Sequence, residues 1–98
     1  MLCIGTAGSP ISTPKSGTLE AIKRVRELDL DAMELEFVRG VYVKDEKKAQ
    51  EIKECAEEYN VKLSVHAPYY INLNSDEKIK IKESMHRIIE SAQVAHLC

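Results

Sequence analysis

The feature that most constrains this sequence is a strand-then-helix pattern that occurs three times at nearly even spacing. Strands are predicted at Leu2–Ile4, Ala32–Phe37 and Val61–His66, and a helical pattern follows each of them. Regular alternation of this kind is typical of consecutive parallel β/α units. The sequence therefore predicts an α/β fold that is built around a parallel sheet.

The helices are predicted at Gly17–Leu28, at Glu46–Tyr59 and from just after Ser75 to the C-terminal end. Asp45 suits the N-cap of the second helix, and Asn60 suits the left-handed position that often ends a helix. The apolar periodicity of the third helix continues to the end of the chain, and no fourth strand follows. We therefore expect residues 1–98 to be the N-terminal part of one larger β/α domain, truncated after its third unit.

Polar and apolar side chains alternate along the second and third predicted strands. The polar positions are Glu34 and Glu36 in one strand and Ser64 and His66 in the other. Because successive side chains of a strand point to opposite faces, one face of the sheet is expected to be polar. In a closed barrel that face is the interior, so Glu36 and His66 would lie on the floor of an active site, with Glu36 as a candidate catalytic carboxylate. A plain half-exposed sheet shows the same alternation.

Composition narrows the possible functions. Fourteen Lys and Arg residues against sixteen Asp and Glu residues give a net charge of −2, whereas proteins that coat nucleic acid are normally basic. No apolar run approaches the ~18 residues of a membrane span, and the N-terminus lacks a signal-peptide pattern, so we expect a cytoplasmic protein without membrane contact.

Cys3, Cys55 and Cys98 form no CxxC pair, which argues against a disulfide framework or a cysteine-type zinc site.

The segment from Val65 to Leu73, VHAPYYINL, carries a more specific signal. It resembles the endonuclease IV family of zinc-dependent apurinic/apyrimidinic endonucleases, which belongs to the xylose isomerase-like TIM-barrel superfamily. In that family the third strand ends in a His, a Tyr follows three residues later, and an Ile-Asn-Leu stretch leads to a helix. Here these positions are His66, Tyr69 and Ile71–Leu73. The resemblance extends over the whole chain and implies the first three units of an eight-unit TIM barrel.

The resemblance also implies a site. His66 would be a zinc ligand in a trinuclear zinc centre, and Tyr69 would lie in a loop that contacts DNA at the abasic site. Arg39 is a candidate for contact with a DNA phosphate, and a solvated loop arginine is the alternative. The implied cofactor is therefore Zn²⁺ and the implied partner is abasic DNA. The family's histidine after the first strand is missing from Thr6–Ser9, and Ala67 replaces its carboxylate after the third strand.

Three functions remain open at this stage. The first is a hydrolase that cleaves DNA beside an abasic site and acts in base-excision repair. The second is a sugar or sugar-phosphate isomerase or epimerase, in which Glu36 and His66 hold a divalent metal or act as acid and base. The third is a fragment with no catalytic role. A catalytic zinc needs about three protein ligands, so we expect this chain alone to be inactive and to self-associate through open strand edges.

Overall fold

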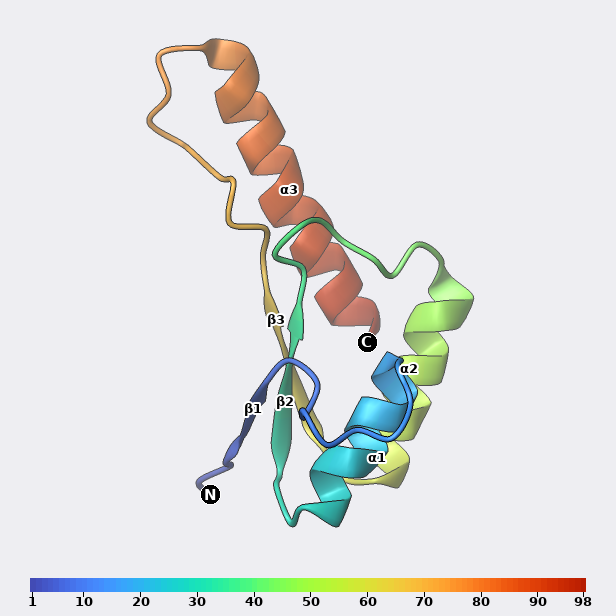
Figure 1. The fold of residues 1–98 in the computed structure, drawn as a ribbon. Coiled ribbons are helices and arrows are strands. Elements are labelled where there is room, and N and C mark those ends of the chain that lie inside the picture. The colour runs from blue at the N-terminus through green and yellow to red at the C-terminus, as the bar shows by residue number, and fades with distance from the viewer.

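The computed structural model describes residues 1–98 and contains three parallel β/α units (Figure 1). The elements are β1 (Gly5–Ala7), α1 (Thr18–Glu27), β2 (Ala32–Glu36), α2 (Glu46–Glu58), β3 (Lys62–His66) and α3 (Lys78–Leu97). The strands form one sheet in the order β1-β2-β3, and both strand pairs are parallel. The α/β class and the parallel sheet that the sequence predicts are confirmed.

The first strand is the clearest difference from the sequence prediction. Apolar residues suggested Leu2–Ile4, but Leu2 and Ile4 are exposed and β1 begins at Gly5. The main chain of Gly5 lies so close to that of Ala32 that a Cβ atom on Gly5 would overlap it. The prediction was wrong because β1 is defined by main-chain pairing to β2 and not by burial of apolar residues. The close pairing is possible because Gly5 has no side chain.

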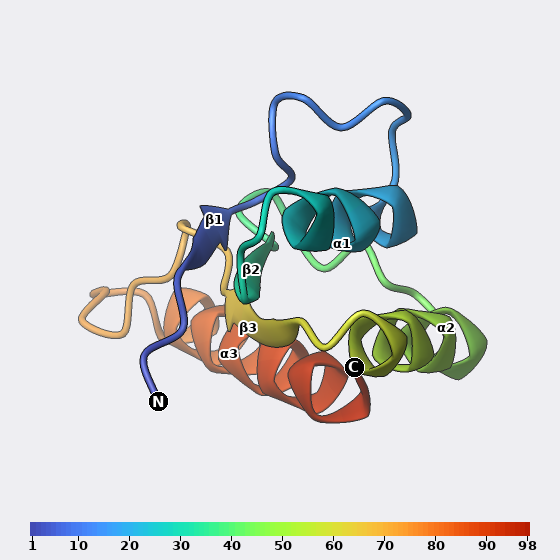
Figure 2. The ribbon, with the colours of Figure 1, turned by 90° about the horizontal axis from the view of Figure 1, so that it is seen from below.

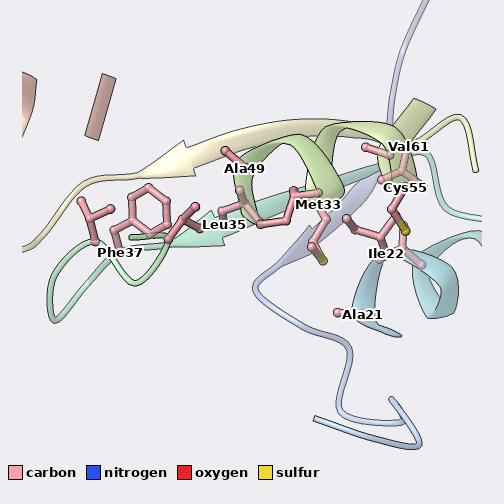
Figure 3. Close-up of a cluster of buried hydrophobic side chains, with 13 residues drawn as sticks. Ala21, Ile22, Met33, Leu35, Phe37, Ala49, Cys55 and Val61 are labelled. Carbon is pink, nitrogen blue, oxygen red and sulfur yellow. The ribbon is translucent and has the colours of Figure 1, made fainter. Parts of the chain in front are cut away.

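The hydrophobic core lies between β2 and the helices α1 and α2 (Figure 3). Met33, Leu35 and Phe37 project from one face of β2 and its end, and each is at most 2% exposed. Ile22 of α1 and Ile52 of α2 are fully buried in the same cluster. Burial of an aliphatic or aromatic side chain of this size contributes about 1.5–3 kcal/mol each, so this cluster is the main source of stability.

The ends of α2 are fixed by specific hydrogen bonds. The backbone N–H of Lys48 donates to Asp45 Oδ1 at 2.7 Å, which confirms the predicted N-cap. Asn60 has φ +52°, as predicted for the residue that ends the helix. The guanidinium of Arg26 on α1 donates to the carbonyl oxygens of Tyr59 and Asn60 at 2.9 and 2.7 Å. These bonds join the C-terminal ends of α1 and α2.

The helices α1 and α2 cover one side of the sheet, and α3 runs along its edge at β3, which leaves the other side uncovered (Figure 2). The third helix directs small polar side chains inward, since Ser84 and Ser91 are 2% and 4% exposed. The apolar residues that recur every three or four positions along this helix, its apolar stripe, are Ile81, Met85, Ile88, Ala92 and Ala95. Of these, Met85 and Ile88 are 51% and 39% exposed. None of the helices is long and apolar enough to cross a membrane. The apolar stripe of α3 therefore faces outward in this structure.

Candidate functional site

The uncovered side of the sheet carries the polar residues of β2 and β3. In the β2–β3 register Glu34 pairs with Ser64 and Glu36 pairs with His66, so all four side chains project from the same face. Glu36 and His66 are exposed, whereas Glu34 is partly buried. Glu36 and His66 are the last residues of β2 and β3, and the C-terminal ends of parallel strands are where α/β barrels place their chemistry. The structure thus brings Glu36 and His66 to one face, as the sequence predicts.

Within this face the closest pair is Glu34 and His66. Glu34 Oε1 lies 3.5 Å from His66 Nδ1, with side chains 34% and 51% exposed. The Glu36 carboxylate lies instead against Gly8, where an added Cβ would be 3.3 Å from its Cδ atom. Gly8 has φ +82°, and its N–H donates to the Glu34 carbonyl oxygen at 3.0 Å. The sequence favoured Glu36 over Glu34, whereas in the structure Glu34 is the carboxylate beside His66 and Glu36 lies beside Gly8.

The turn after β2 and the loop after β3, which carry the predicted DNA contacts, are linked by a main-chain hydrogen bond next to this face. Arg39 lies in the turn that follows β2, and Tyr69 lies in the loop that follows β3. The backbone N–H of Tyr69 donates to the Val38 carbonyl oxygen at 3.3 Å. The hydroxyl of Tyr70 approaches Gly40 so closely that an added Cβ would be 3.3 Å away. Both Arg39 and Tyr69 are exposed, and the Tyr69 side chain packs edge-on against Tyr70.

The loop after β3 is anchored on α3 by polar contacts. Ser84 Oγ accepts a hydrogen bond from the Asn72 N–H at 2.9 Å and donates to the Asn72 carbonyl oxygen at 3.4 Å. Asn72 Oδ1 in turn accepts from the Asn74 N–H at 3.0 Å. The Arg87 guanidinium lies 4.6 Å from the centre of the Tyr70 ring and donates to the Tyr70 carbonyl oxygen. Sequence reasoning missed Ser84, because a serine within a helix gives no signal of a partner twelve residues away.

A pocket of about 460 Å³ opens between the loops that follow β1 and β2. Its lining includes Gly17 and Thr18 at the start of α1, Tyr42 before α2, Lys48 in α2, and Glu36. Thr18 Oγ1 donates to the Tyr42 hydroxyl at 3.3 Å. The volume lies within the range of about 300–1,000 Å³ that small-molecule sites occupy. The pocket therefore offers hydroxyls, an ammonium and a carboxylate to a polar ligand of modest size.

The chain does not by itself complete a zinc site. No three His, Cys, Asp or Glu side chains lie close enough together to hold a metal ion. A catalytic zinc takes about three protein ligands, and the uncovered face offers His66 with Glu34 beside it. The other histidines, His86 and His96, are exposed on α3, the helix that runs along the β3 edge of the sheet (Figure 2). The donors present here fit part of a metal site only.

Burial affects two cysteine thiols of the chain, on α2 and at the C-terminal end of α3. Burial raises the pKa of the Cys55 thiol, and Glu58 and Glu20 act in the same direction while Lys23 opposes them. Burial also raises the pKa of the Cys98 thiol. These two thiols are therefore kept neutral by their surroundings, as in cysteines that pack as small apolar residues.

Two comparisons place the chain among known proteins. A family described as xylose isomerase-like TIM barrel matches residues 22–98, which include β2, β3 and all three helices in whole or in large part. The chain is also 47% identical, over all of its 98 residues, to the uncharacterized protein MJ0133 of Methanocaldococcus jannaschii. It covers 34% of that protein and so spans about a third of the length of its relative.

Proposed function

The chain belongs to the xylose isomerase-like TIM barrel family, and from this premise we propose that it supplies part of the active site of an endonuclease that cleaves DNA at abasic sites. The observation that carries the proposal is the junction of the Arg39 turn with the Tyr69 loop beside the Glu34–His66 pair. A cation, an aromatic ring and a carboxylate–imidazole pair thereby lie along one end of the sheet. Zinc is the cofactor that we propose for the complete barrel.

The side chains of Tyr69 and Arg39 on these two loops are suited to contact an abasic duplex. Where a base is missing, an aromatic side chain can enter the gap and stack on its neighbours. The exposed ring of Tyr69 is available for this role, since it is 73% exposed and its loop is anchored to α3. An arginine beside such a ring contacts phosphates, which position the duplex without reading its sequence. Arg39 is exposed on the adjoining turn and is suited to that contact.

The Glu34–His66 pair is suited to hold a metal ion. A histidine that binds a metal through one ring nitrogen usually has its other nitrogen engaged by a carboxylate or a carbonyl group. The Glu34 carboxylate lies 3.5 Å from Nδ1 of His66, so Nε2 is the ring nitrogen that we propose for the metal. Because this chain provides no third donor, the remaining ligands would have to come from other units of a complete barrel. We propose His66 as a ligand and Glu34 as the residue that orients it.

The proposal is tested by binding of the 98-residue chain to a labelled duplex that contains a tetrahydrofuran abasic analogue, with an intact duplex of the same sequence as reference. Fluorescence anisotropy should show tighter binding to the abasic duplex. Tyr69→Ala should remove this preference and Tyr69→Phe should retain it, because stacking needs the ring and not the hydroxyl. Arg39→Ala should weaken binding to both duplexes alike. Equal affinity of the unchanged protein for both duplexes would contradict the proposal.

A sugar isomerase or epimerase is the second candidate, and the pocket favours it. The pocket has the size of a small-molecule site and contains Glu36, Lys48 and the Thr18 hydroxyl. Carboxylates and amines of this kind transfer protons in sugar chemistry. In an NMR titration with a pentose phosphate, shifts at Thr18 and Lys48 without any preference for abasic DNA would favour this function over the endonuclease.

A further inference from the structure

The turn that carries Arg39 rests against the loop that follows β3. This turn is closed by the N–H of Gly40, which donates to the carbonyl oxygen of the third residue before it at 2.9 Å. On one side of Arg39, the Val38 carbonyl oxygen accepts from the Tyr69 N–H at 3.3 Å. On the other side, a Cβ atom on Gly40 would lie 3.3 Å from the Tyr70 hydroxyl. Arg39 is therefore bracketed by contacts with two consecutive residues of the loop after β3.

Gly40 allows the close approach of the Tyr70 hydroxyl. Its φ of +125° lies in a region that residues with a Cβ atom rarely adopt. A side chain at this position would also crowd the hydroxyl, which is the one atom outside the neighbouring residues that lies within 4 Å of an added Cβ. The backbone of the turn and the side chain of Tyr70 are therefore fitted to one another at this point.

The side chain of Tyr70 also contacts the preceding residue and α3. Its ring packs against the Tyr69 ring at 5.4 Å between the ring centroids, with the two planes 89° apart. From α3, the Arg87 guanidinium lies 4.6 Å from the centre of the Tyr70 ring and donates to the Tyr70 carbonyl oxygen at 3.3 Å. Arg87 is in turn paired with Glu83 of the same helix at 3.7 Å. Tyr70 thereby links α3 both to the Arg39 turn and to the Tyr69 ring.

We propose that Tyr70 is a positioning residue that holds the Tyr69 ring and the Arg39 turn in one arrangement suited to a DNA duplex. This inference rests on the proposed binding of abasic DNA. Tyr69 is 73% exposed, whereas Tyr70 is 42% exposed and is engaged by Arg87 and by the turn. Contacts that are ordered before binding cost less conformational entropy when the duplex binds. Tyr70 therefore acts on DNA through its two neighbours and not by a contact of its own.

Double substitutions test whether Tyr70 acts through these neighbours. The affinities of the 98-residue chain for the abasic and the intact duplex are measured by anisotropy, and their ratio is the preference. Tyr70→Leu should lower the preference about threefold or more, and Tyr70→Phe should retain it because the ring remains. Tyr69→Ala should then cost less preference in Tyr70→Leu than in the unchanged chain, and Arg39→Ala should cost less affinity for the intact duplex. Effects that multiply in full in either pair would overturn the proposal, because Tyr70 would then contribute independently.

A control and a measurement without DNA separate positioning from a general loss of stability. Tyr59→Leu removes a ring of the same size, which packs against the core at the C-cap of α2, and should leave the preference unchanged. In Tyr70→Leu the amide hydrogens of Gly40 and Tyr69 should exchange faster with solvent, whereas in Tyr59→Leu they should exchange as before. An equal loss of preference in Tyr59→Leu and Tyr70→Leu would overturn the proposal.

Arg87→Gln is a second variant, which leaves the Tyr70 ring in place. It removes the cation over the ring and should cause the same losses as Tyr70→Leu to a smaller degree. A chain without any preference for abasic DNA would reject the proposed function. Unchanged exchange at Gly40 and Tyr69 in both Tyr70→Leu and Arg87→Gln would reject the positioning role, whether or not the chain prefers abasic DNA.

Discussion

Glu34 Oε1 lies 3.5 Å from Nδ1 of His66, although the residue opposite His66 in the β2–β3 register is Glu36. The Glu36 carboxylate lies against Gly8, in space that any larger residue would occupy in part. Gly8 in the loop after β1 thus lies beside Glu36, while Glu34 is the carboxylate near the imidazole. Glu34 lies beside the histidine, and both Glu34 and Glu36 line the neighbouring pocket.

This arrangement predicts that His66 is the histidine that binds Zn²⁺ first. In an NMR titration of the chain, the ring signals of His66 should shift at lower Zn²⁺ concentration than those of His86 and His96, because only His66 has a carboxylate at 3.5 Å. Glu34→Gln should weaken this binding about 10-fold or more, which is the usual effect of removing a partner of a ligating histidine. Glu36→Gln should have a smaller effect. Parallel shifts of all three histidines would refute the assignment.

The sequence predicted the parts of the fold that depend on local chemistry. The α2 bounds and both of its caps could be predicted because Asp45 and Asn60 act on their own helix ends. The position of β1 could not, since it depends on the approach of Gly5 to Ala32, far along the chain. The contact of Glu36 with Gly8, and that of Glu34 with His66, likewise join residues that are far apart in the sequence. Contacts between distant residues leave no periodicity that a single sequence displays.

The burial of α3 shows a second kind of limit. Its periodicity correctly indicated a helix, and yet Met85 and Ile88 of the apolar stripe are exposed. Periodicity reports that a helix has an apolar side, whereas the element that covers this side is set by the tertiary structure. In this chain Ser84 and Ser91 occupy the inner side, where Ser84 bonds the loop after β3 and Ser91 bonds the Arg87 carbonyl oxygen of its own helix.

Ser84 is expected to hold the loop that carries Tyr69. In Ser84→Ala the Asn72 N–H loses its acceptor, so amide hydrogen exchange at residues 70–74 should become faster and the free energy of unfolding should fall by about 1 kcal/mol. Ser91→Ala is the matched control, because Ser91 is equally buried and bonds only the Arg87 carbonyl of its own helix. That change should leave the exchange of the loop as it is. If both variants accelerate exchange alike, the loop is not anchored by Ser84.

Arg26 is expected to be the main polar link between α1 and α2. Its guanidinium donates to the carbonyl oxygens of Tyr59 and Asn60, and it lies 3.7 Å from Asp31. Arg26→Ala should lower the free energy of unfolding by about 1–2 kcal/mol. This is less than the contribution of two fully buried charged hydrogen bonds, because the site is partly exposed to water. Urea denaturation measures this change. Arg26→Lys should recover little of it, since a lysine lacks the fork that reaches both carbonyls.

A control for this result comes from another arginine of the same helix. Arg24 bonds Ser12 and Glu27, both through exposed side chains. Arg24→Ala should therefore cost less than about 1 kcal/mol, as is usual for surface pairs. A loss at Arg24 equal to the loss at Arg26 would show that the two carbonyl contacts contribute nothing specific.

Cys55 is expected to make stability fall at alkaline pH. Burial raises the pKa of its thiol above the ordinary value of 9.0, and its Sγ atom donates to the Leu19 carbonyl oxygen at 3.7 Å. As the pH rises through 9, the thiol of the unfolded chain ionises first, so protons leave the unfolded state and the free energy of unfolding decreases. The stabilisation is complete below the unfolded pKa and is lost as the pH rises through the folded pKa. One group contributes a slope of at most about 1.4 kcal/mol per pH unit.

Urea titrations from pH 8 to about 10 should therefore show a steeper decline of the free energy of unfolding in the unchanged protein than in Cys55→Ala, while Cys98 contributes equally to both. Curves that stay parallel over this range would show that the Cys55 thiol ionises as readily in the folded chain as in the unfolded one.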